Sequence, residues 1–295
     1  MIVALRALAR YDGITRITER KLGAVIPRLI ATDLDGTFLD STGRYDALKF
    51  DQQLAAMKAR DIRFVVTTGD PLDHAQSLFC PLKQRHEITY VVEDGALITS
   101  ANGQVLKTAA IAPSLWLAAV TWLKCEPIMA DCFILACGWK RSYTQLTADS
   151  QRFRDSQEFY PSLTHVDQLA TVGDAILKLD LTWLKSDITA QVAAFNRHFA
   201  GSLVATSSGL GGMNVTLPGV NKAAALDFLG DRWQIGSAQM AAFGDSGNDL
   251  AMLQQVGQGF AVANAAPEVL AGAPQRLQHT NDQGAVCEQI DQWLV

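Results

Sequence analysis

From residue 28 onward, short apolar runs alternate with amphipathic segments. Arg28–Thr32 predicts a buried strand that ends at an acidic turn, and the apolar spacing within Asp46–Arg60 predicts a helix. The runs RFVVTTG and TYVVEDG repeat this pattern, with a further helix predicted between them at Pro71–Leu82. Strands that alternate with helices are typical of a parallel, doubly wound sheet.

Residues 97–212 show a different pattern. Two short strands are predicted on either side of Asn102–Gly103, a dipeptide typical of a hairpin turn. At residues 175–183 the run AILKLDLTW alternates apolar and polar positions, as a half-exposed strand does. This mixture of hairpins and helices predicts a separate α+β unit.

The alternation of strands and helices returns in the last third of the chain, beginning with a helix predicted at Asn221–Trp233. The simplest account is one Rossmann-like α/β core, a doubly wound parallel sheet, that is interrupted by an inserted α+β cap domain. The predicted divisions are an N-terminal extension at 1–27, a first core part at 28–96, the cap at 97–212 and a second core part at 213–295.

The composition is that of a folded protein, with 48% hydrophobic and 19% charged residues in a chain of 295. The net charge of −5 disfavours binding to nucleic acid, because that affinity comes largely from Lys and Arg contacts to phosphates. No apolar run reaches the roughly 18 residues of a membrane span. The five cysteines show no CxxC spacing and are expected to be buried free thiols of a reducing compartment. We therefore expect a soluble cytoplasmic protein with no nucleic-acid or membrane partner.

Polar residues follow several of the predicted strands. In an open parallel sheet, ligands bind beyond the carboxyl ends of the strands, so these residues are the candidates for chemistry. They are Asp33 and Asp35 after the first strand, Thr68 and Gly69 after the second, Lys222 at a helix start, and Asp245, Asn248 and Asp249 after the run MAAFG.

Asp33 and Asp35 alternate with the apolar Leu34, so both carboxylates leave the predicted strand toward the same side. Two carboxylates this close repel each other, and Mg²⁺ would relieve the repulsion, with Asp245 as a third carboxylate. One aspartate can then act as a nucleophile. Asp35 is placed to donate a proton to a leaving oxygen and later to take one from water.

A phosphoryl group in transfer needs its oxygens neutralised and held in line. Lys222 would supply the positive charge, and Thr68 and Asn248 would supply neutral hydrogen bonds. Each motif alone has a simpler explanation, since DxD can be an acidic turn, Lys222 a solvated lysine and GDSGND a turn before a capped helix. The ordered set favours a phosphoryl-transfer site.

These motifs resemble those of a known superfamily. DLDGT at 33–37, TTG at 67–69, Lys222 and GDSGNDLAML at 244–253 are similar to the four motifs of the haloacid dehalogenase superfamily. The inserted unit resembles the large cap of its Cof-type (IIB) phosphatases in position and pattern. The run AVANAAPEVLAGAPQRLQHTNDQGAV resembles their C-terminal strand–helix–strand segment, so the resemblance covers about residues 28–295.

The resemblance implies Mg²⁺-dependent hydrolysis of small phosphomonoesters, usually sugar phosphates, through an aspartyl-phosphate. It implies that Asp33 is the nucleophile and Asp35 the general acid and base. The implied metal site consists of Asp33, the backbone carbonyl of Asp35 and Asp245, with Asp249 supporting these ligands from behind. The implied phosphate-binding residues are Thr68, Gly69, Lys222 and Asn248.

The chain departs from the superfamily pattern at two positions. Asp70 stands where Cof-type members usually have Arg, and Asp94–Gly95 stands where they usually have Asn-Gly. These changes remove one positive charge and add two negative charges near the expected site. We therefore expect weaker binding of highly anionic substrates.

Two other functions use the same motifs. One is a phosphosugar mutase similar to phosphomannomutase, and the other is a catalytically weak sensor of a phosphorylated ligand, against which the intact Asp33 and Asp35 pair argues. The protein is expected to be a monomer or a weak homodimer. In the cap, four tryptophans are predicted to pack in the core rather than to form a sugar platform, and three polar residues are weak candidates for leaving-group contacts. These residues are Trp116, Trp122, Trp139 and Trp183, and Lys140, Arg141 and Tyr143.

Overall fold

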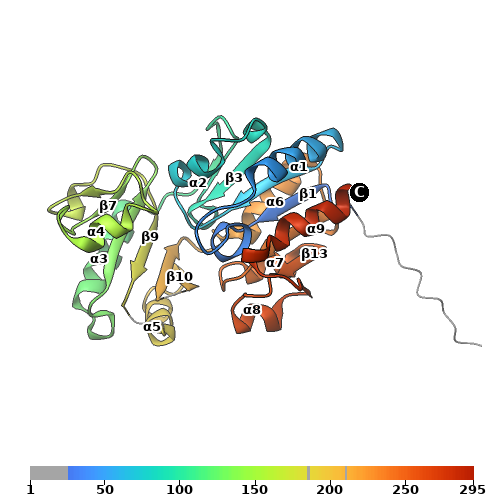
Figure 1. Cartoon of the computed structure of the whole chain (residues 1–295). Helices are drawn as coiled ribbons and strands as arrows, with labels where there is room; N and C mark the ends of the chain where they lie inside the picture. Colours follow the sequence, from blue (N-terminus) through green and yellow to red (C-terminus); the bar gives the residue numbers. More distant parts are fainter. Residues whose placement is uncertain (1–25, 185–186, 210) are drawn as a thin grey trace, which may run out of the picture.

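A computed structural model describes residues 26–184, 187–209 and 211–295, so residues 1–25 of the predicted N-terminal extension lie outside the described residues. The described chain forms two α/β units, a core and a cap, each built on its own sheet (Figure 1). Each unit also has a large hydrophobic cluster of its own. The predicted combination of an α/β core and an inserted cap is confirmed.

The core sheet has eight strands within the described residues, in the order β14-β13-β12-β1-β2-β3-β4-β5. The strands from β14 to β3 are parallel, whereas β4 and β5 are antiparallel. The central strand β1 is buried along its whole length, which is why its sequence is a continuous apolar run. The strands are β1 (Leu29–Thr32), β2 (Arg63–Thr67), β3 (Ile88–Val92), β4 (Leu97–Thr99), β5 (Val105–Thr108), β12 (Met240–Gly244), β13 (Gln258–Ala261) and β14 (Gln275–Arg276).

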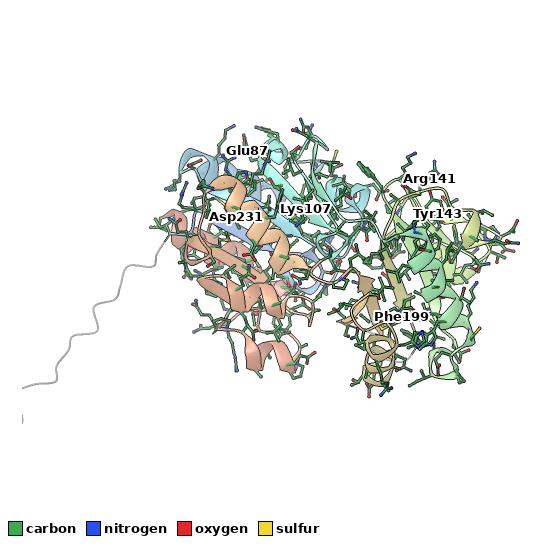
Figure 2. All side chains as sticks on the ribbon, turned by 180° about the vertical axis from the view of Figure 1, so that it is seen from behind. Glu87, Lys107, Arg141, Tyr143, Phe199 and Asp231 are labelled. Carbon is green, nitrogen blue, oxygen red and sulfur yellow. The ribbon has the colours of Figure 1, made fainter. Side chains whose placement is uncertain are left out.

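Helices cover both faces of the core sheet. In Figure 1, α1 and α9 lie in front of it and α6 lies behind it, and Figure 2 shows the same layers from the back. The helix α6 begins at Lys222 because the side chain of Asn221 accepts a hydrogen bond from the backbone N–H of Ala224. The core helices are α1 (Ala47–Ala59), α2 (Leu72–Phe79), α6 (Lys222–Trp233), α7 (Leu250–Gln255), α8 (Pro267–Gly272) and α9 (Ala285–Leu294).

The cap sheet has six strands within the described part of the chain, in the order β10-β11-β9-β6-β7-β8. In β9, Leu179 and Leu181 belong to the cap's hydrophobic cluster. Lys178 and Asp180 alternate with them, so they point to the opposite face of the sheet. The strands are β6 (Phe133–Gly138), β7 (Ser142–Thr144), β8 (Thr164–His165), β9 (Ile176–Thr182), β10 (Val204–Gly209) and β11 (Gly212–Thr216), and the helices are α3 (Pro113–Cys125), α4 (Gln151–Ser156) and α5 (Thr189–His198).

The predicted cap limits of 97 and 212 are wrong at both ends. The hairpin β4–β5 pairs with β3 and therefore extends the core sheet. The strand β11 pairs with β9 and β10, so the cap sheet continues to Thr216. A hairpin has the same local sequence pattern whichever sheet it joins, which is why the pattern assigned this one to the wrong unit.

All five cysteines are free thiols. Cys137 and Cys287 are buried, but Cys80 and Cys125 are exposed, so the prediction of buried thiols is wrong for these two. Both lie at helix ends, Cys80 directly after α2 and Cys125 as the last residue of α3. Among the helices of the described residues, none combines the length and the apolar character that a membrane crossing needs.

Candidate active site

The loop after β1 carries the first predicted site residues. Asp33 follows the strand directly and is buried, while Asp35 is exposed to a cavity between the core and the cap. Gly36 has a φ of +73°, and a Cβ atom on it would lie 2.7 Å from Oδ2 of Asp245. A glycine is required here because both the backbone conformation and the close approach of Asp245 exclude a side chain.

Lys222 joins two carboxylates below this loop. Its Nζ lies 2.6 Å from Oδ1 of Asp33 and 2.7 Å from Oδ1 of Asp249, and its side chain is 1% exposed. Burial alone would lower the pKa of Lys222, but the carboxylates of Asp249 and Asp33 outweigh this effect and raise the pKa. The lysine is therefore charged. Lys222 is the first residue of α6, and its ammonium reaches Asp33 directly after β1.

Asp249 holds the loop after β12 in place. Its Oδ2 accepts hydrogen bonds from the backbone N–H groups of Asp245, at 3.0 Å, and of Ser246, at 3.1 Å. Because Oδ1 is bonded to Lys222, both of its oxygens have partners within the protein. The carboxylate of Asp245 is itself oriented by Thr37, whose hydroxyl donates to Oδ1 at 2.9 Å.

These carboxylates form a site that fits a divalent cation. One oxygen from each of Asp33, Asp245 and Asp249 lies within 4.8 Å of the others. Burial raises the pKa of Asp33 and of Asp245, and Asp249 contributes to both shifts. A bound cation would favour the charged carboxylates, and oxygen donors are the ligands that Mg²⁺ prefers.

The structure brings the predicted phosphate-binding residues to the same place. Thr68, Gly69 and Asn248 line a cavity of about 760 Å³ together with Asp33 and Asp35. These five residues come from the ends of β1, β2 and β12 or from the loops that follow them. Parallel strands end at the same edge of a sheet, so residues from distant parts of the sequence meet there.

Asp70 lies next to Asp35. The surrounding protein partly removes Asp35 from water, and this desolvation is the main cause that raises its pKa to about 6. The negative charge of Asp70 is the second cause. Burial also raises the pKa of Asp70, although Lys178 partly offsets this effect. The ring of His74 is 3.8 Å from Asp70, and burial lowers the pKa of that histidine. At the position where Cof-type members usually have Arg, this chain therefore has a carboxylate that favours the protonated form of Asp35.

Two cap residues that the sequence pattern did not indicate also reach this site. The Nζ of Lys178, on β9, lies 3.1 Å from Oε2 of Glu93 and donates to the carbonyl oxygen of Gly69. Asn214, on β11, donates from Nδ2 to Asp94. The signal that could have revealed Lys178 is its place opposite the leucines of an alternating strand, because a buried charge needs a partner on another element.

The tryptophans behave mostly as predicted. Trp116 and Trp183 are buried in the cap cluster, and Trp122 packs against it, but Trp139 is 48% exposed. Trp183 also lines the 760 Å³ cavity.

The three weak candidates for leaving-group contacts belong to the cap. Figure 2 labels two of them, Arg141 and Tyr143. Lys140 and Arg141 line a separate cavity of about 180 Å³ rather than the one that contains Asp33. Their backbone N–H groups donate to Asp174, and the hydroxyl of Tyr143 donates to the same carboxylate at 3.2 Å. This carboxylate therefore ties the segment together within the cap, away from the candidate active site.

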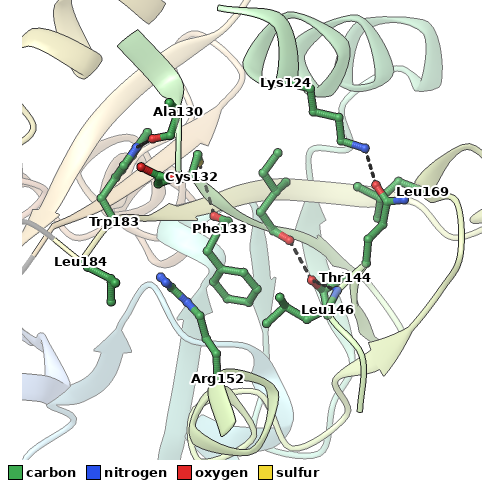
Figure 3. A pocket seen from close by; sticks show the side chains of 13 residues that line it. Lys124, Ala130, Cys132, Phe133, Thr144, Leu146, Arg152, Leu169, Trp183 and Leu184 are labelled. Carbon is green, nitrogen blue, oxygen red and sulfur yellow. Dashed lines mark hydrogen bonds between the residues drawn. The ribbon is translucent and has the colours of Figure 1, made fainter. Parts of the chain in front are cut away.

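A further cavity of about 640 Å³ lies within the cap (Figure 3). The guanidinium of Arg152 lies over the ring of Phe133, 4.6 Å from its centroid. These two residues, with Trp183 and Leu184, also line the 760 Å³ cavity. The two cavities therefore adjoin each other along this part of the cap.

Comparisons with known proteins agree with the fold and the site. The family described as haloacid dehalogenase-like hydrolase matches residues 30–290. The chain is 32% identical to 5-amino-6-(5-phospho-D-ribitylamino)uracil phosphatase YbjI of Escherichia coli K12, over 90% of this chain and 96% of that protein. It is 25% identical to the HMP-PP phosphatase of Serratia proteamaculans, over 90% and 95% of the two chains. The crystal structure of SMU.1108c from Streptococcus mutans UA159 superposes with a TM-score of 0.84 at 32% identity, over 91% of this chain and 99% of that one.

The chain belongs to the haloacid dehalogenase-like hydrolases. Its structural neighbours include the subclass IIB sugar phosphatase BT4131, with a TM-score of 0.75 at 16% identity over 91% of this chain and all of that one, which shows a shared fold. Within the family, the protein is a hydrolase of phosphoric monoesters.

Proposed function

We propose that the protein is a Mg²⁺-dependent phosphatase of small phosphorylated metabolites that acts through an aspartyl-phosphate on Asp33. The observation that carries this proposal is the position of Lys222, whose ammonium bonds both Asp33 and Asp249 while Asp245 lies beside them. A buried ammonium that contacts the candidate nucleophile, with the carboxylate of Asp245 beside them, suits the binding of a phosphoryl group. The free cysteines are consistent with a protein of the cytoplasm.

In the proposed first step, Asp33 attacks the phosphorus atom. Lys222 bonds Oδ1, so Oδ2 is the candidate nucleophile. The new bond joins Oδ2 to phosphorus, and the bond between phosphorus and the leaving oxygen breaks. Asp35 donates its proton to that oxygen, and the raised pKa of this carboxyl, about 6, keeps a larger protonated fraction near neutral pH than an ordinary aspartate has.

In the proposed second step, the aspartyl-phosphate is hydrolysed. Asp35, now a carboxylate, takes a proton from water, whose oxygen attacks phosphorus and releases inorganic phosphate and Asp33. Lys222, Thr68 and Asn248 hold the phosphoryl oxygens during both steps. Bound Mg²⁺ would be held by Asp33, Asp245 and the backbone carbonyl of Asp35, and it would neutralise charge on the phosphoryl group.

The proposed substrates are sugar phosphates and related metabolites with a polar leaving group. The E. coli relative is named for a phosphorylated ribitylaminouracil, whose leaving group combines a sugar alcohol chain with a heterocyclic ring. The cap side of the 760 Å³ cavity offers Arg152, Asp180 and Tyr160 for hydrogen bonds and Trp183 for ring contacts. Such a leaving group matches these residues in size and polarity.

The test is phosphate release from para-nitrophenyl phosphate and from a panel of phosphates of sugars, nucleotides and ribitylaminouracil. Each assay is run with Mg²⁺, with EDTA and with Asp33→Asn. We expect release that requires Mg²⁺, stops in EDTA and is lost in the variant. A folded protein that binds Mg²⁺ but releases phosphate from no substrate would contradict the proposal. Conversion of one sugar phosphate into its isomer would instead identify a mutase.

A further inference from the structure

The loop after β3 has an unusual backbone. Glu93 and Asp94 have φ values of +50° and +55°, in the left-handed region that residues other than glycine rarely adopt. Both side chains are buried, with exposed fractions of 2% and 8%. Two consecutive residues in this conformation cost free energy, and such strain persists where the surrounding contacts hold it.

Two amide donors and one ammonium lie around the carboxylate of Asp94. The amide of Asn248, from the core loop after β12, donates from Nδ2 to Oδ1 at 2.8 Å. The amide of Asn214, on the cap strand β11, donates from Nδ2 to Oδ2. The ammonium of Lys178, on the cap strand β9, lies 3.7 Å from the same Oδ2. One carboxylate thus joins a candidate phosphate ligand to two residues of the cap.

The chemistry of a carboxylate determines which end of the Asn248 amide faces it. An ionised aspartate only accepts hydrogen bonds, so the NH₂ group of Asn248 must face Asp94, and the amide oxygen is repelled. One N–H of this group is bonded to Asp94, and the other has no partner among the described residues, so it can donate to a phosphoryl oxygen. An amide at position 94 could pair with either end of Asn248, so it would not select this orientation.

We propose that Asp94 is a positioning residue that holds the amide of Asn248 in the orientation for phosphate binding, and that Asn214 and Lys178 of the cap hold Asp94 for this role. The proposal rests on the proposed function, because it assumes that Asn248 contacts phosphate. It explains the aspartate that replaces the usual asparagine. Both oxygens of Asp94 accept from an amide, so an asparagine at this position would keep both bonds only if one of the facing amides turned its oxygen toward it.

The test is a double-mutant cycle between Asp94→Asn and Asn248→Ala. Inorganic phosphate is the probe, because it occupies the phosphate site without a leaving group. Its affinity is measured, with Mg²⁺ present, as the inhibition constant in the phosphatase assay and as protection against thermal unfolding. Removal of the Asp94 charge by itself would favour phosphate binding, whereas loss of the fixed Asn248 amide would weaken it. We expect the loss of the amide orientation to dominate and Asp94→Asn to weaken phosphate binding by about tenfold, about the free energy of a hydrogen bond to a charged group. In the Asn248→Ala background the same change should have less than about a twofold effect.

Glu93→Gln is the matched control. Glu93 is the neighbouring buried carboxylate on the same strained loop, and it also pairs with Lys178, but it has no bond to either amide. We expect Glu93→Gln to change phosphate affinity by less than about twofold, and equally in both backgrounds. A general disturbance of the loop would make the two substitutions behave alike, which would overturn the proposal.

Equal losses from Asp94→Asn in both backgrounds, or no loss in either, would also overturn it. If Asp94→Asn does not fold, Asn214→Leu takes its place, because it removes one cap donor and leaves the carboxylate. It should weaken phosphate binding only when Asn248 is present, and an equal loss without Asn248 would overturn the proposal. If no substrate is hydrolysed, the proposed function fails, but thermal protection by phosphate still tests the position of the amide.

Discussion

Among the described residues, two lysines are buried, and each lies between two carboxylates. Lys222 belongs to the core, and its partners Asp33 and Asp249 come from loops at one edge of the same sheet. Lys178 belongs to the cap, and its carboxylate partners lie across the domain boundary on the loop after β3. For both lysines, burial would lower the pKa, but the surrounding carboxylates outweigh it and raise the pKa.

The two clusters have similar chemistry but different origins. The cluster around Lys222 assembles when the core folds, because parallel strands bring its members to one edge. The cluster around Lys178 also requires the cap to pack against the core. In the proposed function the first cluster contacts the reacting groups, whereas the second joins the cap to the loop after β3. Substitutions can separate these two roles.

The largest expected effect is that of Lys222→Met on activity. This change removes the charge beside Asp33 and a donor to the phosphoryl group, and one such preorganised group is worth about 10²–10³-fold in rate. We expect kcat/KM for para-nitrophenyl phosphate to fall by about that factor. Initial rates at saturating Mg²⁺ measure it. Activity equal to that of Lys178→Met would contradict the distinction between the clusters.

Lys178→Met should act mainly on stability. Its removal leaves Glu93 and Asp94 buried without a cation, and breaking a buried ion pair in this way costs about 3–5 kcal/mol. We expect the free energy of unfolding in denaturant to fall by that amount, with a smaller loss of kcat/KM than in Lys222→Met. Adding Glu93→Gln should restore part of the stability, because it removes one unpaired charge. An unchanged free energy of unfolding would show that the cap cluster does not tie the domains together.

Asp70→Asn should have a smaller effect on substrate binding. Asp70 lines the 760 Å³ cavity, so its charge opposes a dianionic phosphate ester. Its removal should lower KM for a sugar phosphate by roughly fivefold, equivalent to about 1 kcal/mol. Asp231→Asn on the exposed surface of the core is the matched control for net charge (Figure 2). An equal fall of KM in both variants would show that the effect comes from the net charge and not from the place of Asp70 in the cavity.

The last expected effect is on the pH dependence of stability. Burial raises the pKa of Glu93 to about 7, although Lys178 partly offsets it, and Asp94 and Asp180 add to the shift. Between about pH 4.5 and 7 the folded protein then binds a proton at Glu93 more readily than the unfolded chain does. The free energy of unfolding should therefore fall as the pH rises through this window, and Glu93→Gln should reduce the fall. Denaturant titrations of the wild type and of Glu93→Gln at pH 5 and pH 7.5 measure this change. The same pH dependence of the free energy of unfolding in both proteins would contradict the assignment of the effect to Glu93.

Much of the core could be predicted from the sequence. The apolar runs of β1, β2 and β12 and the polar residues that follow them indicated both the parallel sheet and the edge at which candidate residues meet. The structure brings Asp33, Thr68 and Asn248 to one cavity there. The substitutions of Asp33 and Asn248 test their catalytic and binding roles, and the role of Thr68 remains a prediction. The prediction worked for the fold because a parallel sheet allows few places for the ends of its strands.

The cap contacts could not be predicted in the same way. The alternation in β9 indicated that Lys178 and the leucines point to opposite faces, but not which element covers each face. The hairpin after β3 showed its turn but not the sheet that it joins.

By itself, the sequence determined the order of strands and helices, the residues at the strand ends and the family to which the chain belongs. Only the tertiary structure decided that the hairpin extends the core sheet, that Lys178 lies against Glu93, and that two amides and the Lys178 ammonium meet at Asp94. The physical reason is that periodicity and turn chemistry act over a few residues, whereas the partner of a strand edge or a buried charge is chosen by packing between distant segments.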